Sequence, residues 1–184
     1  MGEQRERLAR GEWYLDDEEL AGLRRACARL LDRFNRAGSD EDDVRAGVLG
    51  ELLGGLGEGV DVVPTFRCSY GSHVHLGDRV FVNADAFLMD DATITIGADT
   101  RIGPGARLMT ALHPVDDHDR RREGWERALP VVLGENVWLG ASVTVGPGVT
   151  IGADTVVGAG SVVLDDLPER VVAVGVPARV VRRT

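Results

Sequence analysis

One of the four histidines in this chain of 184 residues, His113, has surroundings that suggest chemistry. It begins a polar, charged stretch, residues 113–130, which contains two prolines. A histidine ring titrates near neutral pH, so it can take the proton of a hydroxyl group while that hydroxyl attacks an acyl carbonyl. His113 is therefore a candidate general base, although from position alone a solvated loop histidine fits equally well.

A six-residue repeat indicates the structure that must position His113. From Leu76 to Val163 an aliphatic residue recurs every six positions, usually followed by glycine, and a small or β-branched residue stands four positions after it. This pattern has neither the helical period nor strand alternation; it is typical of a parallel β-helix whose aliphatic side chains stack from coil to coil. We expect the glycines to turn the corners. The clearest aliphatic positions are Leu133, Leu139, Val145, Ile151, Val157 and Val163, and the second positions are Val137, Val143, Val149, Thr155 and Ser161.

Two interruptions break the repeat. A slip of two residues at Asp90-Asp91-Ala92 separates the repeats that start at Leu76 from those that start at Ile96, and a longer break follows Leu108. The longer break cannot stay in register with the wall of the β-helix, so we expect residues 111–130 to project as a loop. Long ordered loops in a compact domain are more often functional than accidental.

The residues before the repeat have a helical pattern instead. Apolar side chains follow helical spacing after Asp17, Gly38 stands beyond them, and Ser39 with Asp42 has the spacing of a capping box that opens a second helix. Glycines at positions 54, 55 and 57 would end the second helix. The apolar residues of the first helix are Leu20, Leu23, Cys27, Leu30, Leu31 and Phe34, and those of the second are Val44, Val48, Leu49, Leu52 and Leu56.

These patterns predict a mainly β protein with two parts. Residues 1–58 would form a helical cap segment, and residues 59–184 a β-helical domain with loop 111–130 and a C-terminal tail. A β-helix exposes unpaired backbone at both ends, so we expect the helices to cover one end and residues 171–181 to cover part of the other.

Composition narrows the function. The net charge of −9 disfavours a nucleic-acid partner, so we expect an enzyme that acts on small molecules. No apolar stretch is long enough to span a membrane or form a secretion signal, so we expect a cytoplasmic location. Cys27 and Cys68 lack ligand-like spacing, and we expect both to be reduced packing residues. A zinc-dependent β-helix enzyme needs three histidines at coil spacing on its wall. His73, His75 and His118 do not have this spacing, so we expect no metal.

Several motifs, taken in order along nearly the whole chain, closely resemble those of the galactoside and maltose O-acetyltransferases. The resemblance implies a left-handed β-helix and a homotrimer, with sites between neighbouring subunits that move acetyl from acetyl-CoA to a sugar hydroxyl. The motifs are Ser69-Tyr70-Gly71-Ser72, Phe81-Val82-Asn83, Asp90-Asp91, His113-Pro114-Val115, Asn136-Val137-Trp138-Leu139-Gly140, Gly158-Ala159-Gly160-Ser161 and Gly175-Val176-Pro177-Ala178-Arg179.

The resemblance also implies site residues. His113 matches the family's catalytic base, and a backbone N–H near Ala141 and Ser142 would meet the oxyanion. The residues that match acceptor-binding positions are Asp16, Ser69, Asn83 and Asp91. Two of these have structural alternatives: Asp16 or Asp17 caps a helix, and Asn83 fits a left-handed turn. His118 either replaces the histidines that relatives carry after the base or is a solvated loop residue.

For acetyl-CoA, arginines suit the phosphates of the cofactor. The matching positions are Trp138, Ala141, Ser142, Ala159, Gly160, Leu164, Asp165, Arg179 and Arg182. In the family a threonine and a lysine stand where this chain has Leu164 and Asp165, so a cation near the cofactor is replaced by an anion.

Two classes of function remain. The first is an acetyl-CoA-dependent O-acetyltransferase that acts through a ternary complex, because no serine or cysteine has an adjacent base. The second is a β-helical trimer that serves as a binding or scaffold module without catalysis, which Leu164 and Asp165 suggest. Acetylation of an acceptor other than a sugar is an intermediate possibility.

Overall fold

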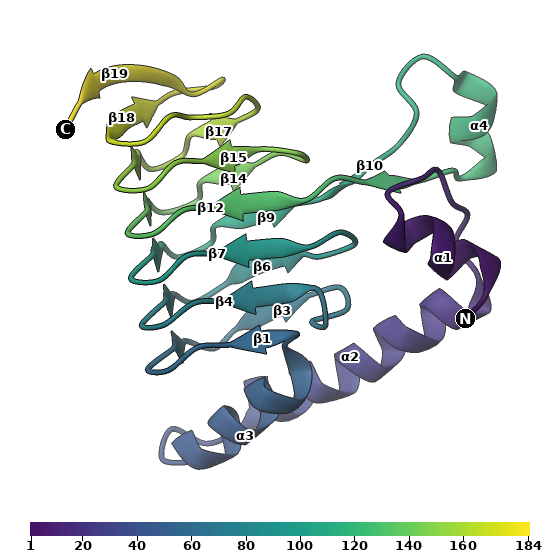
Figure 1. The fold of residues 1–184 in the computed structure, drawn as a ribbon. Helices are drawn as coiled ribbons and strands as arrows, with labels where there is room; N and C mark the ends of the chain where they lie inside the picture. The colour runs from purple at the N-terminus through teal and green to yellow at the C-terminus, as the bar shows by residue number, and fades with distance from the viewer.

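Residues 1–184 are described by a computed structural model, in which short strands wind into a parallel β-helix (Figure 1). Each full coil gives one strand to each of three sheets. The first sheet contains β1 (Gly55–Leu56), β4 (Val74–Leu76), β7 (Ile94–Ile96), β12 (Val131–Leu133) and β15 (Thr150–Ile151). The second contains β2 (Asp61–Val62), β5 (Phe81–Val82), β8 (Arg101–Ile102), β13 (Trp138–Leu139), β16 (Val156–Val157), β18 (Val171–Val174) and β19 (Arg179–Arg183). The third contains β3 (Phe66–Cys68), β6 (Ala86–Met89), β9 (Arg107–Met109), β14 (Thr144–Val145) and β17 (Val162–Val163).

The aliphatic repeat lines the interior. Leu76, Ile96, Leu133 and Ile151 stand in register across the first sheet, and all four are buried. Burial of a side chain of this size contributes about 1.5–3 kcal/mol, so each coil stabilises its neighbours. The second positions, from Val137 to Ser161, are buried as well. The predicted fold class, a mainly β protein built on a β-helix of hexapeptide coils, is confirmed.

The glycines of the repeat have a different role from the one we expected. A Cβ at Gly134 would lie 2.6 Å from the backbone nitrogen of Ala153, and a Cβ at Gly140 would lie 2.6 Å from that of Ala159. The left-handed conformation is adopted two residues later instead, for example by Asn136, with φ of 53°. These glycines are therefore required by the close approach of successive coils.

Three helices precede the coils: α1 (Glu3–Ala9), α2 (Glu18–Arg36) and α3 (Asp42–Leu52). Asp17 is the N-cap of α2, since its carboxylate accepts a hydrogen bond from Leu20 N at 2.9 Å. The capping box predicted for α3 is wrong, because the helix begins after Glu41, whose carboxylate accepts from Gly38 N instead.

The burial of the helices follows the predicted pattern only in part. On α2 the residues Leu20, Cys27 and Phe34 are buried as expected. On α3, the second of the two predicted helices, Val44 is 45% exposed. Leu56 lies in β1 and is 40% exposed, so both residues were wrongly assigned to the apolar side of this helix. Helix α1 was not predicted, because its only buried residue is Leu8 and it has no apolar stripe.

Both ends of the β-helix are covered as expected. Helices α2 and α3 lie across the end next to β1, and β18 with β19 forms an antiparallel pair at the other end (Figure 1). Cys27 of α2 and Cys68 of β3 are buried and free, as predicted, and their Sγ atoms lie 3.5 Å apart. No helix has the length and apolar character needed to cross a membrane.

The longer break in the repeat projects from the β-helix as predicted (Figure 1). It is a hairpin in which β10 (Ala111–Leu112) pairs with β11 (Arg127–Ala128), and it carries a short helix, α4 (His118–Glu123). Asp117 caps α4 through Arg120 N at 3.0 Å, and Gly124 ends it in a left-handed conformation. Local capping signals therefore order a segment that has no apolar repeat.

Candidate active site

A cavity of about 500 Å³ lies at the base of the projecting loop, where the third sheet turns into the first. We call it the loop cavity. The N-terminal segment, three successive coils and the loop all contribute to its wall. The lining residues are Asp16, Arg24, Ser69, Met89, Asp91, Met109, Ala111, His113 and Glu126. Four residues predicted from the sequence, namely Asp16, Ser69, Asp91 and His113, are thus brought together.

His113 is held in one tautomer. Its Nδ1 lies 3.0 Å from the backbone oxygen of Trp125, across the hairpin. A carbonyl oxygen only accepts hydrogen bonds, so Nδ1 must carry a hydrogen, and in the neutral ring it is Nε2 that has the free lone pair. His113 is exposed and lines the loop cavity. A neutral ring with a free Nε2 is the form that a general base requires.

The slip in the repeat serves the site through both of its aspartates. Asp90 is fully buried, and one carboxylate oxygen accepts from Ser69 N at 2.8 Å and Tyr70 N at 2.9 Å. This fixes the corner that presents Ser69. Burial raises the pKa of Asp90, and the two backbone donors oppose that rise.

Asp91 faces the loop cavity and is 8% exposed. Burial raises its pKa, the carboxylates of Glu126 and Asp90 raise it further, and the guanidinium of Arg24 opposes the rise. A buried acid that the fold keeps near other acids reduces stability, and such groups cluster at functional sites.

The N-terminal helix separates the roles of two adjacent acids. Because Asp17 caps α2, the neighbouring Asp16 is free to accept from Arg24 Nη2 at 2.6 Å. Arg24 also donates to the Tyr70 hydroxyl at 2.8 Å. Sequence reasoning missed Arg24, although a charged residue within the apolar stripe of α2 is a signal that could have identified it.

Tyr14 and Glu126 are also part of the site and were not predicted. The Tyr14 hydroxyl donates to Glu126 Oε2 at 2.9 Å and lies 3.4 Å from Asp91 Oδ1. Tyr14 is completely buried, and burial followed by the nearby carboxylates raises its pKa. No spacing or motif marks either residue, because their contact joins segments 112 positions apart.

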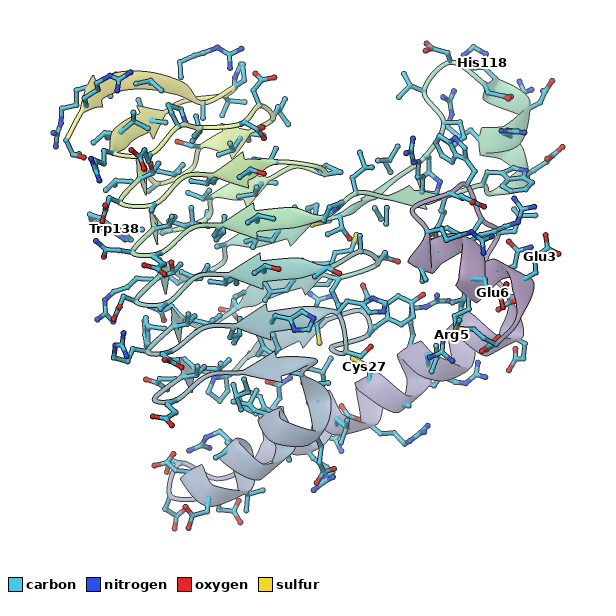
Figure 2. All side chains as sticks on the ribbon, viewed as in Figure 1. Glu3, Arg5, Glu6, Cys27, His118 and Trp138 are labelled. Carbon is cyan, nitrogen blue, oxygen red and sulfur yellow. The ribbon has the colours of Figure 1, made fainter.

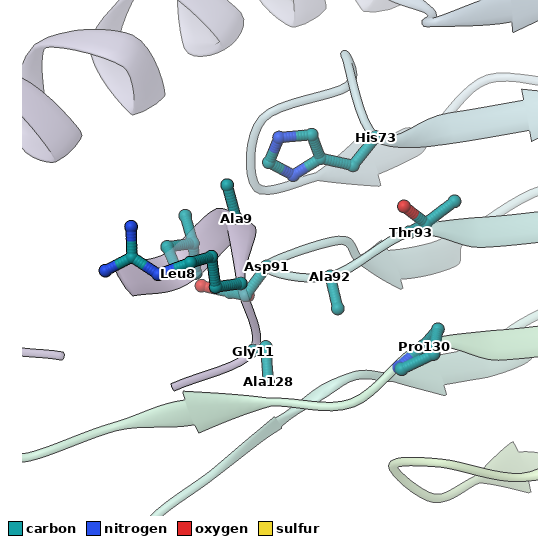
Figure 3. Close-up of a pocket in the computed structure, with 10 residues that line it drawn as sticks. Leu8, Ala9, Gly11, His73, Asp91, Ala92, Thr93, Ala128 and Pro130 are labelled. Carbon is teal, nitrogen blue, oxygen red and sulfur yellow. The ribbon is translucent and has the colours of Figure 1, made fainter. Parts of the chain in front are cut away.

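A second cavity, of about 400 Å³, lies on the other side of Asp91 between α1 and the coils (Figure 3). His73 lies at its edge, and its Nδ1 is 2.7 Å from the backbone oxygen of Asp90. His113 does not line this cavity. No group of three or more His, Cys, Asp or Glu residues is placed to hold a metal ion.

The other predicted residues lie elsewhere in the chain. Asn83 stands at the corner between the second and third sheets, where its side chain accepts from Ala84 N at 2.8 Å. It is not the left-handed residue of that turn; Asp85 is, with φ of 62°. His118 begins α4 at the outer end of the loop and does not line the loop cavity (Figure 2).

Most residues predicted to bind the cofactor share the corner of Asn83. They form an exposed ladder over successive coils, in which Gly160 N donates to Ala141 O at 2.8 Å. This corner is not the one at which the loop cavity lies, and Trp138, in β13 of the second sheet, lies on the side of the β-helix opposite the loop (Figure 2). The exposed residues of this group are Trp138, Ala141, Ser142, Ala159 and Gly160.

The remaining predicted cofactor residues lie near the C-terminal end. Arg179 Nη1 and Asp165 Oδ2 form an ion pair at 3.1 Å, with side chains 63% and 72% exposed. Leu164 is 59% exposed beside them in sequence, and Arg182 lies in β19. Asp165 therefore occupies one of the two arginines expected to meet phosphate.

Known proteins match both parts of this architecture. Residues 7–57 match the maltose acetyltransferase hexapeptide capping motif, and residues 130–165 match the bacterial transferase hexapeptide (six repeats). The galactoside O-acetyltransferase of Escherichia coli K12 is 39% identical over 96% of this chain and 87% of that protein. A maltose O-acetyltransferase from Clostridium difficile 630 has a crystal structure that is 39% identical and has a TM-score of 0.96, over 98% of this chain and 96% of that one. A hexapeptide-repeat acetyltransferase from Vibrio cholerae O1 biovar eltor, solved with acetyl-CoA, is 36% identical with a TM-score of 0.90, over 99% and 98%.

Proposed function

Because the chain belongs to the family of hexapeptide-repeat acetyltransferases that includes the galactoside and maltose O-acetyltransferases, we propose that it acetylates a sugar hydroxyl with His113 as general base. It is an acetyl-CoA-dependent acetyltransferase, and acetyl-CoA is its co-substrate. The observation that carries the proposal is the 3.0 Å contact of His113 Nδ1 with the Trp125 carbonyl, which in the neutral ring leaves Nε2 free at the loop cavity.

The lining of the loop cavity supports a polyhydroxylated acceptor. Asp16, Asp91 and Glu126 supply carboxylate oxygens that accept hydrogen bonds from hydroxyl groups, and Arg24 supplies donors. Met89 and Met109 add apolar surface against which the carbons of a sugar ring can pack. A cavity of about 500 Å³ is large enough for a sugar-sized ligand.

Transfer within a ternary complex fits the same site. His113 Nε2 would take the proton of the acceptor hydroxyl as that oxygen attacks the thioester carbonyl, and the same proton would then reach the departing thiolate of coenzyme A. Cys27 and Cys68 are buried outside the loop cavity, so neither is placed to form an acyl-enzyme.

We propose that the complete site spans two chains of a homotrimer. Within one chain His113 and Asp91 stand at one corner of the β-helix, whereas Asn83 and the ladder of Ala141 and Gly160 stand at another. A neighbouring chain that places its Asn83 corner against the loop cavity would complete the site. Cytoplasmic acetyl-CoA would supply the acetyl group.

A non-catalytic trimer is the second candidate, and one observation favours it. Asp165 pairs with Arg179, so the C-terminal arginines offer less free positive charge to the phosphates of a cofactor. Acetylation of an amine or another non-sugar acceptor would keep the same base and the same cofactor. Release of coenzyme A in the presence of a panel of sugars and amines, read with a thiol reagent, separates these possibilities.

Mixed subunits test the shared site directly. His113→Ala and Asn83→Ala chains carrying different tags are co-expressed, and trimers that contain both are purified. If a site takes His113 from one chain and Asn83 from its neighbour, every trimer that contains both variants keeps one intact site of its three, so activity should return to about a third of the wild-type level. The matched control combines His113→Ala with Asp91→Asn, which lie in the same chain's cavity and should not complement. Activity that stays at the level of either variant alone contradicts the two-chain site.

A further inference from the structure

The segment between α1 and α2 is attached to the projecting loop at one point. Tyr14 N donates to Glu126 O at 2.9 Å, and Glu126 N donates to Tyr14 O at 2.9 Å, as in an antiparallel bridge. Arg127 Nε donates to Gly11 O at 2.8 Å beside it. These main-chain and side-chain hydrogen bonds join the N-terminal segment to the projecting loop.

The side chain of Tyr14 adds a second attachment. Its hydroxyl has one hydrogen, and the shorter distance assigns that hydrogen to Glu126 Oε2, at 2.9 Å, rather than to Asp91 Oδ1, at 3.4 Å. Asp91 belongs to the coil and Glu126 belongs to the loop. One buried hydroxyl therefore stands between the loop and the wall of the β-helix at the loop cavity.

The base depends on the same point of the loop. Trp125 precedes Glu126, and its carbonyl oxygen receives the hydrogen of His113 Nδ1. If Glu126 moves, the carbonyl that fixes the tautomer and the plane of the ring moves with it. Beyond this point residues 115–124 are exposed, while nearer the β-helix the two arms of the hairpin are joined by the pairing of β10 with β11.

We propose that Tyr14 is a positioning residue for acetyl transfer, in that its hydroxyl holds Glu126 against Asp91 and thereby keeps the Trp125 carbonyl on His113 Nδ1. The inference rests on the proposed function of His113 as general base. It assigns to the N-terminal segment a part in the reaction, in addition to covering the coils.

Tyr14→Phe removes the hydroxyl and keeps the buried ring and the main-chain bridge. It leaves the Glu126 carboxylate without its buried donor. Because a small displacement of a catalytic group is enough to slow a reaction strongly, we expect kcat/KM for the acceptor to fall roughly tenfold, with KM for acetyl-CoA unchanged. The control is Trp13→Phe, which also reduces an aromatic side chain of the segment but leaves the Glu126 contacts intact, and it should retain activity.

A double-mutant cycle shows whether the hydroxyl acts through Glu126. Glu126→Ala should lower kcat/KM itself, and in that background Tyr14→Phe should change kcat/KM by less than about twofold. Two effects that multiply independently would overturn the proposal.

The ring nitrogens of His113 give a readout that does not depend on turnover. Nitrogen chemical shifts of labelled protein, assigned with a His113→Gln variant, should show the Nδ1–H tautomer in the wild type and a mixture in Tyr14→Phe. If Tyr14→Phe does not fold, Glu126→Ala, which leaves Tyr14 in place, should show the same mixture. A wild-type tautomer in every folded variant would overturn the proposal. If the wild-type protein shows no acetyl transfer, the proposed function is wrong. The nitrogen chemical shifts alone then decide whether Tyr14 positions the ring of His113.

Discussion

Asp165→Lys is expected to tighten the binding of coenzyme A. In the structure Asp165 Oδ2 lies 3.1 Å from Arg179 Nη1, so the aspartate both repels phosphate and occupies a guanidinium that the phosphates need. A lysine at this position releases Arg179 and adds a second cation. Both changes act in the same direction on an anionic ligand.

The magnitude follows from the exposure of the pair. The two side chains are 63% and 72% exposed, so each charge interaction is screened by solvent and is worth only about 0.2–1 kcal/mol. Two such terms amount to about 0.4–2 kcal/mol, which corresponds to a dissociation constant lowered by about two- to thirtyfold. The folded state should be almost unaffected, because an exposed ion pair contributes little to stability.

Calorimetric titration of coenzyme A at low and high salt measures this effect. The gain should shrink as salt rises, since the Debye length falls from about 10 Å at 0.1 M to about 3 Å at 1 M. Asp165→Asn should give an intermediate affinity. Asp166→Asn is the matched control, because it removes an adjacent charge while an amide oxygen can still accept from Thr150 N, as Asp166 does at 2.7 Å. Equal affinities for all four proteins at low salt would refute the reasoning and place the phosphates elsewhere.

Three further predictions concern the loop cavity and the core. His113→Ala should fold, because the ring is exposed, but should lower acetyl transfer roughly a hundred- to ten-thousandfold; wild-type turnover would exclude His113 as the base. Asp91→Asn should lower activity yet raise the free energy of unfolding at neutral pH, since burial raises the pKa of Asp91 and disfavours its ionised form. The unfolded chain releases that proton at lower pH, so the advantage of the variant should decrease as pH falls through the raised pKa; urea unfolding at two pH values checks the sign. Cys27 and Cys68 should react with a thiol reagent only after denaturation, because both are buried and the pKa of Cys68 is raised by its contact with Cys27 and by burial.

The repeat predicted the β-helix because each hexapeptide carries the same local signal, and the packing of Leu133 on Ile151 simply copies that of Leu76 on Ile96. The predictions fail where a single hydrogen bond, and not a repeated pattern, decides the local structure. The Ser39 capping box was overruled by the Glu41 carboxylate, which reaches Gly38 N at 2.6 Å.

The residues of the candidate site also fall into those that a pattern identified and those that it did not. Asp91 was identifiable because a slip of two residues in a regular repeat marks it, and His113 because the longer break does. Glu126 lies in the same loop but has no spacing that sets it apart, and Tyr14 lies in a short linker between two helices. Their partnership exists only once the chain has folded, so no property of either segment alone could reveal it.

The regular coils explain how the chain tolerates a site that lowers its folding stability. A β-helix gains its stability from contacts between neighbouring coils, so an interruption weakens only the coils beside it. Asp90 and Asp91 are buried in such an interruption at a cost in folding free energy, while Ile96 and Leu88 on either side are fully packed. The projecting loop leaves the β-helix after β9 and returns to it at β12, at the corner between the third and first sheets. The projecting loop can therefore vary in length and composition without disturbing the repeat, whereas a change at Tyr14 or Asp91 would disturb the buried contact of Tyr14 with Asp91 and Glu126.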